Sequence, residues 1–189
     1  KKRQHEIARL GISRTFQNIR LFQGLNTVEN VMAACDVNRH YGFISSILNF
    51  PNKRANEKIS FNESMEYLKM VGIEQYAYEK VNSLPYGIQR KIEIARALAA
   101  KPKVLLLDEP AAGLNPSEMV DLMDLIKRIN KEMGISVLII EHKMELIHGL
   151  CRYIYVLDFG KPLAQGTPDE IKNNAAVTKA YIGEDDDLC

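Results

Sequence analysis

The sequence has no run of apolar residues long enough to cross a membrane and no pattern of a secretory signal peptide. A membrane-spanning helix needs about 20 consecutive, mostly apolar residues. If the protein works at a membrane, another subunit must therefore do the crossing. The chain also lacks an initiating Met and begins with the polar residues 1–9, so we expect it to be a fragment or a processed form of a longer protein.

The sequence also lacks a strong net charge and any cysteine pattern typical of a metal site. The formal net charge of +1 provides no field that would attract nucleic acid or an anionic bilayer, so we expect no nucleic-acid partner. The cysteines Cys35, Cys151 and Cys189 lie far apart and form no C-x-x-C pair. We interpret them as buried or incidental thiols of a reducing cytosol.

The 189 residues suffice for one core with a satellite subdomain, and no internal repeat divides them. We predict an α/β core from residue 81 onward, after a more irregular, partly helical region. The elements expected before this core are a weak strand at residues 11–16, a helix capped by Thr27, and a helix at residues 63–71 that ends at Gly72. Residues 36–62 are expected to form a loop with a short packed helix; the alternative is a partner-docking surface on the apolar patch at residues 43–50.

Residues 84–116 organise the rest of the chain, because they combine a helix, an apolar run and two adjacent acids. The elements predicted in and after this stretch are a helix at residues 86–100, a strand at 104–107, a helix from 116 to Gly134 and a strand at 135–140. The apolar runs show no alternation, which is typical of parallel strands buried on both faces. Asn115, Pro116 and Glu118 form the cap, first-turn proline and acid that begin a helix.

The last part of the chain is predicted to consist of short elements. These are a helix at residues 143–150, a hairpin of residues 153–157 and 163–165 around a turn at 158–161, and a helix from Thr167 to about residue 174. The acidic residues 184–187 are expected to be a solvated tail.

Asp108 and Glu109 close the apolar run, where the carboxyl ends of parallel strands collect ligands. An aspartate in this position can hold Mg²⁺ through oxygen atoms, next to phosphate. The following residue points elsewhere, so Glu109 can orient or deprotonate an attacking water. A solvated loop start is the alternative, but the four apolar residues before the pair and Pro110 after it favour the chemical interpretation.

Three other residues are candidates for the same chemistry. Gly87 opens a helix whose N-terminal N–H groups and dipole suit an anion. His142 follows the second strand and can hydrogen-bond a phosphate or a water, with an ordinary surface histidine as the alternative. Gln17 is the first polar residue after the weak strand and can reach a metal or water.

These segments resemble the nucleotide-binding domain of ATP-binding cassette (ABC) transporters, in particular the ATPase subunit of bacterial branched-chain amino acid importers. In order, RTFQN looks like the glutamine loop, LPYGIQRKIEIARAL the signature and its helix, VLLLDEP the Walker B strand, AAGLNP the D-loop and IIEHKME the switch-histidine loop. The stretch GLCRYIYVLDFGKPLAQGTPDEI looks like the family's C-terminal end, so the resemblance covers nearly the whole chain.

The resemblance implies an α/β, P-loop NTPase-like ABC ATPase core with a parallel sheet and a helical subdomain, truncated at the N-terminus. It implies that residues 1–21 end the N-terminal ATPase core, that residues 22–83 form the helical subdomain, and that residues 84–189 carry the remaining motifs. The implied cofactors are ATP and Mg²⁺. The implied partners are a second ATPase subunit, transmembrane permease subunits and, indirectly, a substrate-binding protein, at the cytoplasmic face of the bacterial membrane.

The resemblance also implies a role for each site residue. Asp108 would bind Mg²⁺ through water, and Gln17 would bind it as well. Glu109 would polarise the hydrolytic water, and His142 would sense the γ-phosphate. Gln17 would also relay the presence of nucleotide to the permease. The residues implied to contact nucleotide across a dimer are Pro85, Tyr86, Gly87, Ile88, Gln89 and Asn115.

The sequence departs from the family pattern at several of these positions. Pro85, Tyr86 and Ile88 replace Ser, Gly and Gln of the usual L-S-G-G-Q signature, so backbone N–H groups from Gly87 onward must replace the missing hydroxyl. Asn115 stands where many relatives have Asp. The largest departure is that the 189 residues contain no G-x-x-x-x-G-K-[ST] loop, which would cradle the phosphates.

Two hypotheses follow for function. The intact protein is expected to be the ATPase subunit that powers an ABC importer for branched-chain amino acids; lipopolysaccharide export or another amino acid are alternative cargoes, because this subunit does not contact the cargo. The 189-residue chain by itself is expected to be inactive, as a non-catalytic piece that lacks the phosphate loop.

Overall fold

The computed structural model describes residues 2–35 and 51–181, without the side chains of residues 51–54. The chain divides into two compact units, Lys1–Ile140 and Glu141–Cys189, and each is described by itself. The predicted boundaries after residues 21 and 83 stay predictions, and the apolar patch at residues 43–50 lies outside the described residues. Within the described residues, no helix is both long and apolar enough to cross a membrane.

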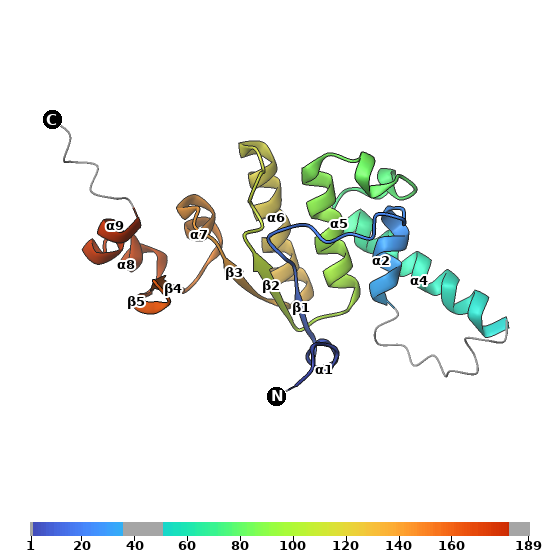
Figure 1. Ribbon diagram of the computed structural model, residues 1–189, viewed down its shortest axis with the longest axis horizontal. Helices are drawn as coiled ribbons and strands as arrows, with labels where there is room; N and C mark the ends of the chain where they lie inside the picture. Colours follow the sequence, from blue (N-terminus) through green and yellow to red (C-terminus); the bar gives the residue numbers. More distant parts are fainter. Residues whose placement is uncertain (1, 36–50, 182–189) are drawn as a thin grey trace. The chain divides into compact units, whose positions relative to one another are not determined.

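A parallel sheet of three strands lies in the first unit, in the order β1-β2-β3 (Figure 1). These strands are β1 (Ile12–Arg14), β2 (Val104–Asp108) and β3 (Ser136–Ile140). The register pairs Ile12 with Val104, and Asp108 with Ile140, so β2 and β3 end side by side. The strands predicted around these positions and their parallel pairing are confirmed.

The two apolar strands differ in burial. In β2, Leu105 and Leu107 are only 0% and 1% exposed. In β3, Leu138 and Ile140 are each 56% exposed, so the prediction of a strand buried on both faces is wrong for β3. A continuous apolar run favours a strand, but it does not determine whether another element covers each face.

The helix α6 (Pro116–Met133) connects β2 to β3 and packs against β3. Its cap is the predicted one: Glu118 N donates to Asn115 Oδ1 at 3.0 Å, and Asn115 N donates to Glu118 Oε2 at 2.9 Å. The helix ends at Gly134, whose φ of 65° lies in the left-handed region that glycine adopts without strain. Local sequence chemistry therefore sets both ends of α6.

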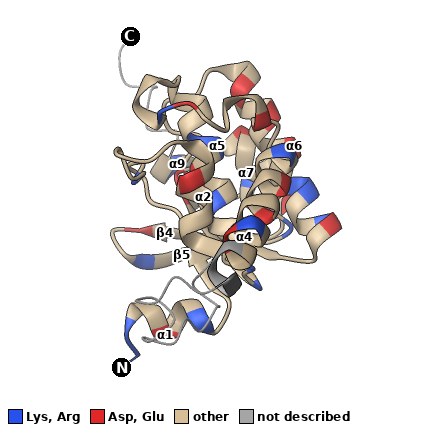
Figure 2. Cartoon of the chain, turned by 90° about the vertical axis from the view of Figure 1, so that its right-hand side faces the viewer, with Lys and Arg blue, Asp and Glu red and all other residues tan. Residues whose placement is uncertain are grey.

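Three helices of the first unit pack against one another: α2 (Thr27–Cys35), α4 (Pro51–Met70) and α5 (Tyr86–Ala99). The other elements are α1 (Gln4–Arg9) before β1 and the 3₁₀ turns η2 (Glu74–Tyr76) and η3 (Val81–Ser83) between α4 and α5. Figure 2 shows basic and acidic residues interspersed along α4 and α6. This mixture accords with the small net charge of the sequence.

Two predictions in this helical group are wrong in detail. The cap of α2 is Asn26, not Thr27, because Glu29 N donates to Asn26 Oδ1 at 2.9 Å. Thr27 is buried instead, and its hydroxyl donates to Glu79 O at 3.2 Å. The helix α4 begins at Pro51 rather than near residue 63. Its first turns are rich in polar residues that favour a helix, with proline at the first position. These turns show no apolar stripe, so the sequence pattern did not reveal them.

The second unit contains α7 (Met144–Leu150), a hairpin of β4 (Ile154–Asp158) and β5 (Lys161–Gly166), and the helices α8 (Pro168–Lys172) and α9 (Ala175–Tyr181). The predicted hairpin turn is confirmed, with positive φ at Phe159 and Gly160. The predicted Thr167 cap of α8 is confirmed as well. The sequence did not predict α9, which follows α8 after two residues.

Candidate active site

The two acids of the candidate site lie at the carboxyl end of β2. Asp108 is the last residue of the strand, and its N–H donates to the hydroxyl of buried Thr15 at 3.4 Å. Glu109 follows, and its N–H donates to Ile140 O at 2.9 Å, at the end of β3. Hydrogen bonds from these two N–H groups to both neighbouring segments therefore fix the chain at the point where the acids begin.

The carboxylate of Asp108 is paired with a cation that sequence analysis did not identify. Arg14, the last residue of β1, places its Nη2 2.7 Å from Asp108 Oδ2. The side chains are 52% and 20% exposed, so water weakens this pair, and such pairs contribute at most about 1 kcal/mol to stability. Strand pairing is the reason for the contact, since Arg14 lies beside Leu106, two residues before Asp108.

Glu109 has an unusual backbone conformation, with a φ of 43° in the left-handed region. A non-glycine residue held there stores about 1–3 kcal/mol of strain, and such strain is concentrated at functional sites. The Glu109 side chain meets the predicted site residue Gln17, whose Nε2 donates to Glu109 Oε2 at 2.8 Å. The structure therefore brings together two candidate residues that are 92 positions apart in the sequence.

The first turn of α5 contains the predicted signature residues. Pro85 occupies the N-cap position without a side-chain cap, and Gln89 Nε2 donates to Leu84 O at 2.8 Å. Gly87 is buried, and a Cβ added there would lie 2.4 Å from Glu118 Oε1. In this structure the close approach that Gly87 permits is to a carboxylate of the chain itself, on α6.

The signature turn also contacts the loop before α6. The ring of Tyr86 lies beside Gly113, because a Cβ added to Gly113 would be 3.1 Å from Tyr86 Cε1. Asn115, a predicted nucleotide contact, uses its side chain as the N-cap of α6. Ile88 is half-buried within the same turn of α5. The roles of these residues toward nucleotide remain predictions.

His142 belongs to the second unit, two residues beyond the end of β3. Its side chain is 63% exposed, and its Nδ1 lies 3.9 Å from Glu141 Oε2. The Glu141 carboxylate is 1% exposed and accepts from the N–H groups of His142 and Lys143 at 3.0 and 3.2 Å. Glu141 therefore fixes the backbone that carries the histidine.

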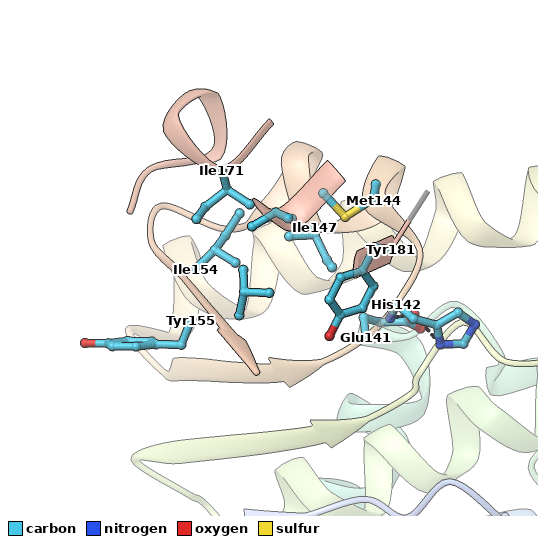
Figure 3. A pocket seen from close by; sticks show the side chains of 10 residues that line it. Glu141, His142, Met144, Ile147, Ile154, Tyr155, Ile171 and Tyr181 are labelled. Atoms are coloured by element: carbon cyan, nitrogen blue, oxygen red, sulfur yellow. Dashed lines mark hydrogen bonds and ion pairs between the residues drawn. The ribbon is translucent and has the colours of Figure 1, made fainter. Parts of the chain in front are cut away.

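Both residues lie at one end of an apolar pocket within the second unit (Figure 3). Its apolar lining includes Met144, Ile147 and Ile171. The functional role of His142 stays a prediction.

Similarity to known proteins identifies the family. A family model described as "ABC transporter" matches residues 1–112, and one described as "Branched-chain amino acid ATP-binding cassette transporter" matches residues 161–187. The chain is 42% identical over 180 residues to the high-affinity branched-chain amino acid transport ATP-binding protein BraF of Pseudomonas aeruginosa, covering 95% of this chain and 71% of BraF. The chain belongs to the ABC transporter family.

Other ABC proteins match over a similar length. The lipopolysaccharide export system ATP-binding protein LptB of Escherichia coli is 33% identical over 181 residues, covering 96% of this chain and 69% of LptB. A dimeric, post-hydrolysis structure of the ATP-binding cassette MJ0796, bound to ADP and Pi, superposes with a TM-score of 0.70. That match has 27% identity and covers 86% of this chain and 65% of that chain. The predicted ABC ATPase fold is therefore confirmed.

Asp108 and Gln17 fit the Mg²⁺ that the ABC family implies. Asp108 already holds a cationic group at 2.7 Å, and carboxylate and amide oxygens, as in Asp108 and Gln17, are the ligands that Mg²⁺ prefers. Among the described residues, no group of three or more His, Cys, Asp or Glu side chains forms a metal cluster. A magnesium ion bound by Asp108 and Gln17 would therefore complete its ligand set with phosphate and water, as is usual for this ion.

Proposed function

We propose that this chain is part of an ATP-hydrolysing subunit that powers an importer for branched-chain amino acids. The similarity to BraF over 95% of the chain supports this cargo class. The proposal of ATP hydrolysis rests on one observation, the hydrogen bond of 2.8 Å between Gln17 and Glu109. Glu109 directly follows Asp108 in the sequence. The proposed metal ligand Asp108 and the proposed water-orienting acid Glu109 are consecutive at the end of β2, and Gln17 contacts Glu109.

Each residue of this edge has a separate task in the proposal. Bound Mg²⁺ would neutralise charge on the phosphates. Asp108 and Gln17 would hold the ion, and Arg14 would then have to share or release the Asp108 carboxylate. Glu109 orients the attacking water and accepts its proton. The left-handed backbone of Glu109 and its bond to Gln17 fix the direction of the carboxylate before any ligand arrives.

The signature turn serves the nucleotide of a second subunit in this proposal. Tyr86 is 41% exposed at the start of α5, so this end of the helix is accessible to a partner. The contacts across the dimer are assigned to Pro85, Tyr86, Gly87, Ile88, Gln89 and Asn115. The dimeric MJ0796 cassette supports a paired arrangement. His142, on an exposed side chain, is assigned to sensing the γ-phosphate.

The remaining partners in the proposal follow from transport. Permease subunits cross the membrane, a substrate-binding protein delivers cargo to them, and this subunit lies at their cytoplasmic face. Gln17 is the proposed relay to the permease, because its side chain reaches Glu109 while its backbone lies in the segment between β1 and α2.

The test is Glu109→Gln in a form of the protein that hydrolyses ATP. Glutamine keeps the size of the side chain and an oxygen that can accept from Gln17, but it cannot accept a proton from water. We expect ATP binding to be retained and hydrolysis to fall by about 10²–10⁴-fold, the usual effect of removing a general base.

Glu132→Gln, on the exposed end of α6, is the matched control and should leave hydrolysis unchanged. Turnover of Glu109→Gln near that of the parent protein would refute the assignment of Glu109.

A non-catalytic role is the alternative for the 189-residue chain by itself, since these residues contain no phosphate-loop motif. Calorimetric titration of this chain with Mg-ATP separates the two. We expect no measurable binding, and tight binding would mean that the described residues suffice to hold nucleotide. Lipopolysaccharide export is the alternative transport process, supported by the 33% identity to LptB; the cargo of the reconstituted transporter decides between the two.

A further inference from the structure

Helix α5 contains a buried ion pair that the proposed chemistry does not use. Arg90 Nη1 lies 2.8 Å from Glu93 Oε2, and the side chains are only 1% and 2% exposed. Removing two charges from water is unfavourable unless further hydrogen bonds satisfy both groups. The atoms that supply those bonds therefore indicate what the pair holds in place.

Both charged groups bind the backbone of the segment that carries Gln17. Arg90 Nη1 donates to Phe16 O at 2.8 Å, and Arg90 Nη2 donates to Gln17 O at 2.9 Å. In the opposite direction, Phe16 N donates to Glu93 Oε1 at 3.3 Å. Three hydrogen bonds between this segment and one helix thus hold three consecutive peptide groups, from the N–H of Phe16 to the carbonyl of Gln17.

The same guanidinium also reaches the signature turn. Arg90 Nη2 donates to Tyr86 Oη at 3.0 Å, and Arg90 Cζ lies 5.7 Å from the centre of the Tyr86 ring. From Gln17, the side chain continues to Glu109 at 2.8 Å. A continuous series of contacts therefore leads from Tyr86 through Arg90 and Gln17 to Glu109.

We propose that Arg90 and Glu93 are positioning residues, which hold the Gln17 backbone so that its side chain reaches Glu109 and which tie that segment to the Tyr86 turn. Any effect of this positioning on ATP hydrolysis rests on the proposed function, whereas the positioning of the Gln17 backbone does not. A displacement of the signature turn by a second subunit then moves Gln17 through a single side chain. In this way the state of one nucleotide site is transmitted to the other.

Arginine is needed for this task because of its shape. Its planar fork offers N–H groups on two nitrogens, which here serve Phe16, Gln17, Tyr86 and Glu93 at once. A lysine carries three donors on one atom and cannot span four acceptors. A pair needed only for stability could be replaced by apolar residues of similar volume with little loss.

The first experiment compares Arg90→Lys with Arg96→Lys in the 189-residue chain, without nucleotide. Both arginines lie on α5, but the guanidinium of Arg96 packs over the ring of Phe22, with its Cζ 5.5 Å from the ring centre.

We expect amide hydrogen exchange in the peptide covering residues 15–20 to be at least about tenfold faster in Arg90→Lys, with the parent rate in Arg96→Lys. In NMR spectra, the chemical shift of the Gln17 side-chain amide should move toward the value of a solvent-exposed amide only in Arg90→Lys. Unchanged exchange and an unchanged Gln17 resonance in Arg90→Lys would overturn the proposal.

A second variant separates positioning from folding. The double variant Arg90→Met/Glu93→Leu removes both charges and keeps similar volume, so we expect melting within a few degrees of the parent chain. Exchange at residues 15–20 should nevertheless remain fast. Recovery of parent-like protection in the double variant would overturn the proposal, because the Gln17 backbone would then be held without the ion pair. Neither result would bear on Glu109, whose test is independent.

Discussion

Gly87 and Glu118 provide a quantitative test of how the first turns of α5 and α6 fit together. A Cβ on Gly87 would lie 2.4 Å from Glu118 Oε1 and 3.0 Å from its Cδ, which is closer than atoms can approach. The Glu118 side chain cannot move without loss, because its Oε2 accepts from Asn115 N at 2.9 Å in the cap of α6. In Gly87→Ala, the carboxylate must therefore leave the cap.

The loss can be estimated from the parts. Removing a helix cap costs about 1 kcal/mol, with a range of about 0.5–2 kcal/mol. Replacing glycine by alanine in a helix returns up to about 1 kcal/mol, and less in the first turn, where Gly87 lies. We therefore expect Gly87→Ala to lower the free energy of unfolding by up to about 1 kcal/mol. In a Glu118→Ala background, where no carboxylate obstructs the Cβ, the same change should be neutral or stabilising.

Urea denaturation followed by far-UV circular dichroism measures all four members of this cycle, with the slope m compared among them. The expected coupling between the two positions is about 1–2 kcal/mol. Gly24→Ala is the matched control, since no atom lies within 4 Å of a Cβ at Gly24. Equal effects of Gly87→Ala in both backgrounds would refute the proposed contact.

Two further predictions concern charged groups. Arg14→Gln should lower the free energy of unfolding by less than about 1 kcal/mol, because the pair with Asp108 is partly exposed, and the difference should shrink in 1 M salt; a larger, salt-independent loss would contradict this. Hydrogen bonds from the Thr167 backbone and hydroxyl lower the pKa of Glu170 from its ordinary value of 4.5. The stabilisation by this carboxylate is therefore present above pH 4.5 and lost as the pH falls through the lowered pKa, and Glu170→Gln should flatten stability across that interval in acid titrations.

Local signals in the sequence predicted much of the fold. The Asn115 cap and the Gly134 end of α6 depend on residues within a few positions of each other, and both are confirmed. The α4 start was missed because helix formation at residues 51–62 relies on polar helix formers, which produce no periodic apolar pattern. The exposed face of β3 was missed because an apolar run does not specify which element packs against each face of the strand.

The candidate site was predictable as a set of residues but not as a set of contacts. Glu109 was identified from its position after a strand and Gln17 through the family resemblance, yet their hydrogen bond joins segments 92 residues apart. Arg90 and Glu93 were missed because charged residues are usually solvated, and sequence gives little sign that a charge is buried. Arg14 was missed because its contact with Asp108 depends on the pairing of two strands that are distant in the sequence. The available signal of a buried pair was the spacing of Arg90 and Glu93, opposite charges three positions apart on one helix. The apolar residue Ile94, which the structure buries, lies next to Glu93.

The open side of β3 also affects how this chain behaves in solution. Leu138 and Ile140 present an apolar face, and no described strand pairs with the outer edge of β3. Unpaired backbone groups beside exposed apolar side chains form a template for further strands, and therefore for aggregation. Solubility should thus depend on concentration and on whatever covers this face. The substitution Leu138→Lys, two residues before the end of β3, should reduce aggregation. Asp108 and Glu109 would not be altered, because they belong to the neighbouring segment.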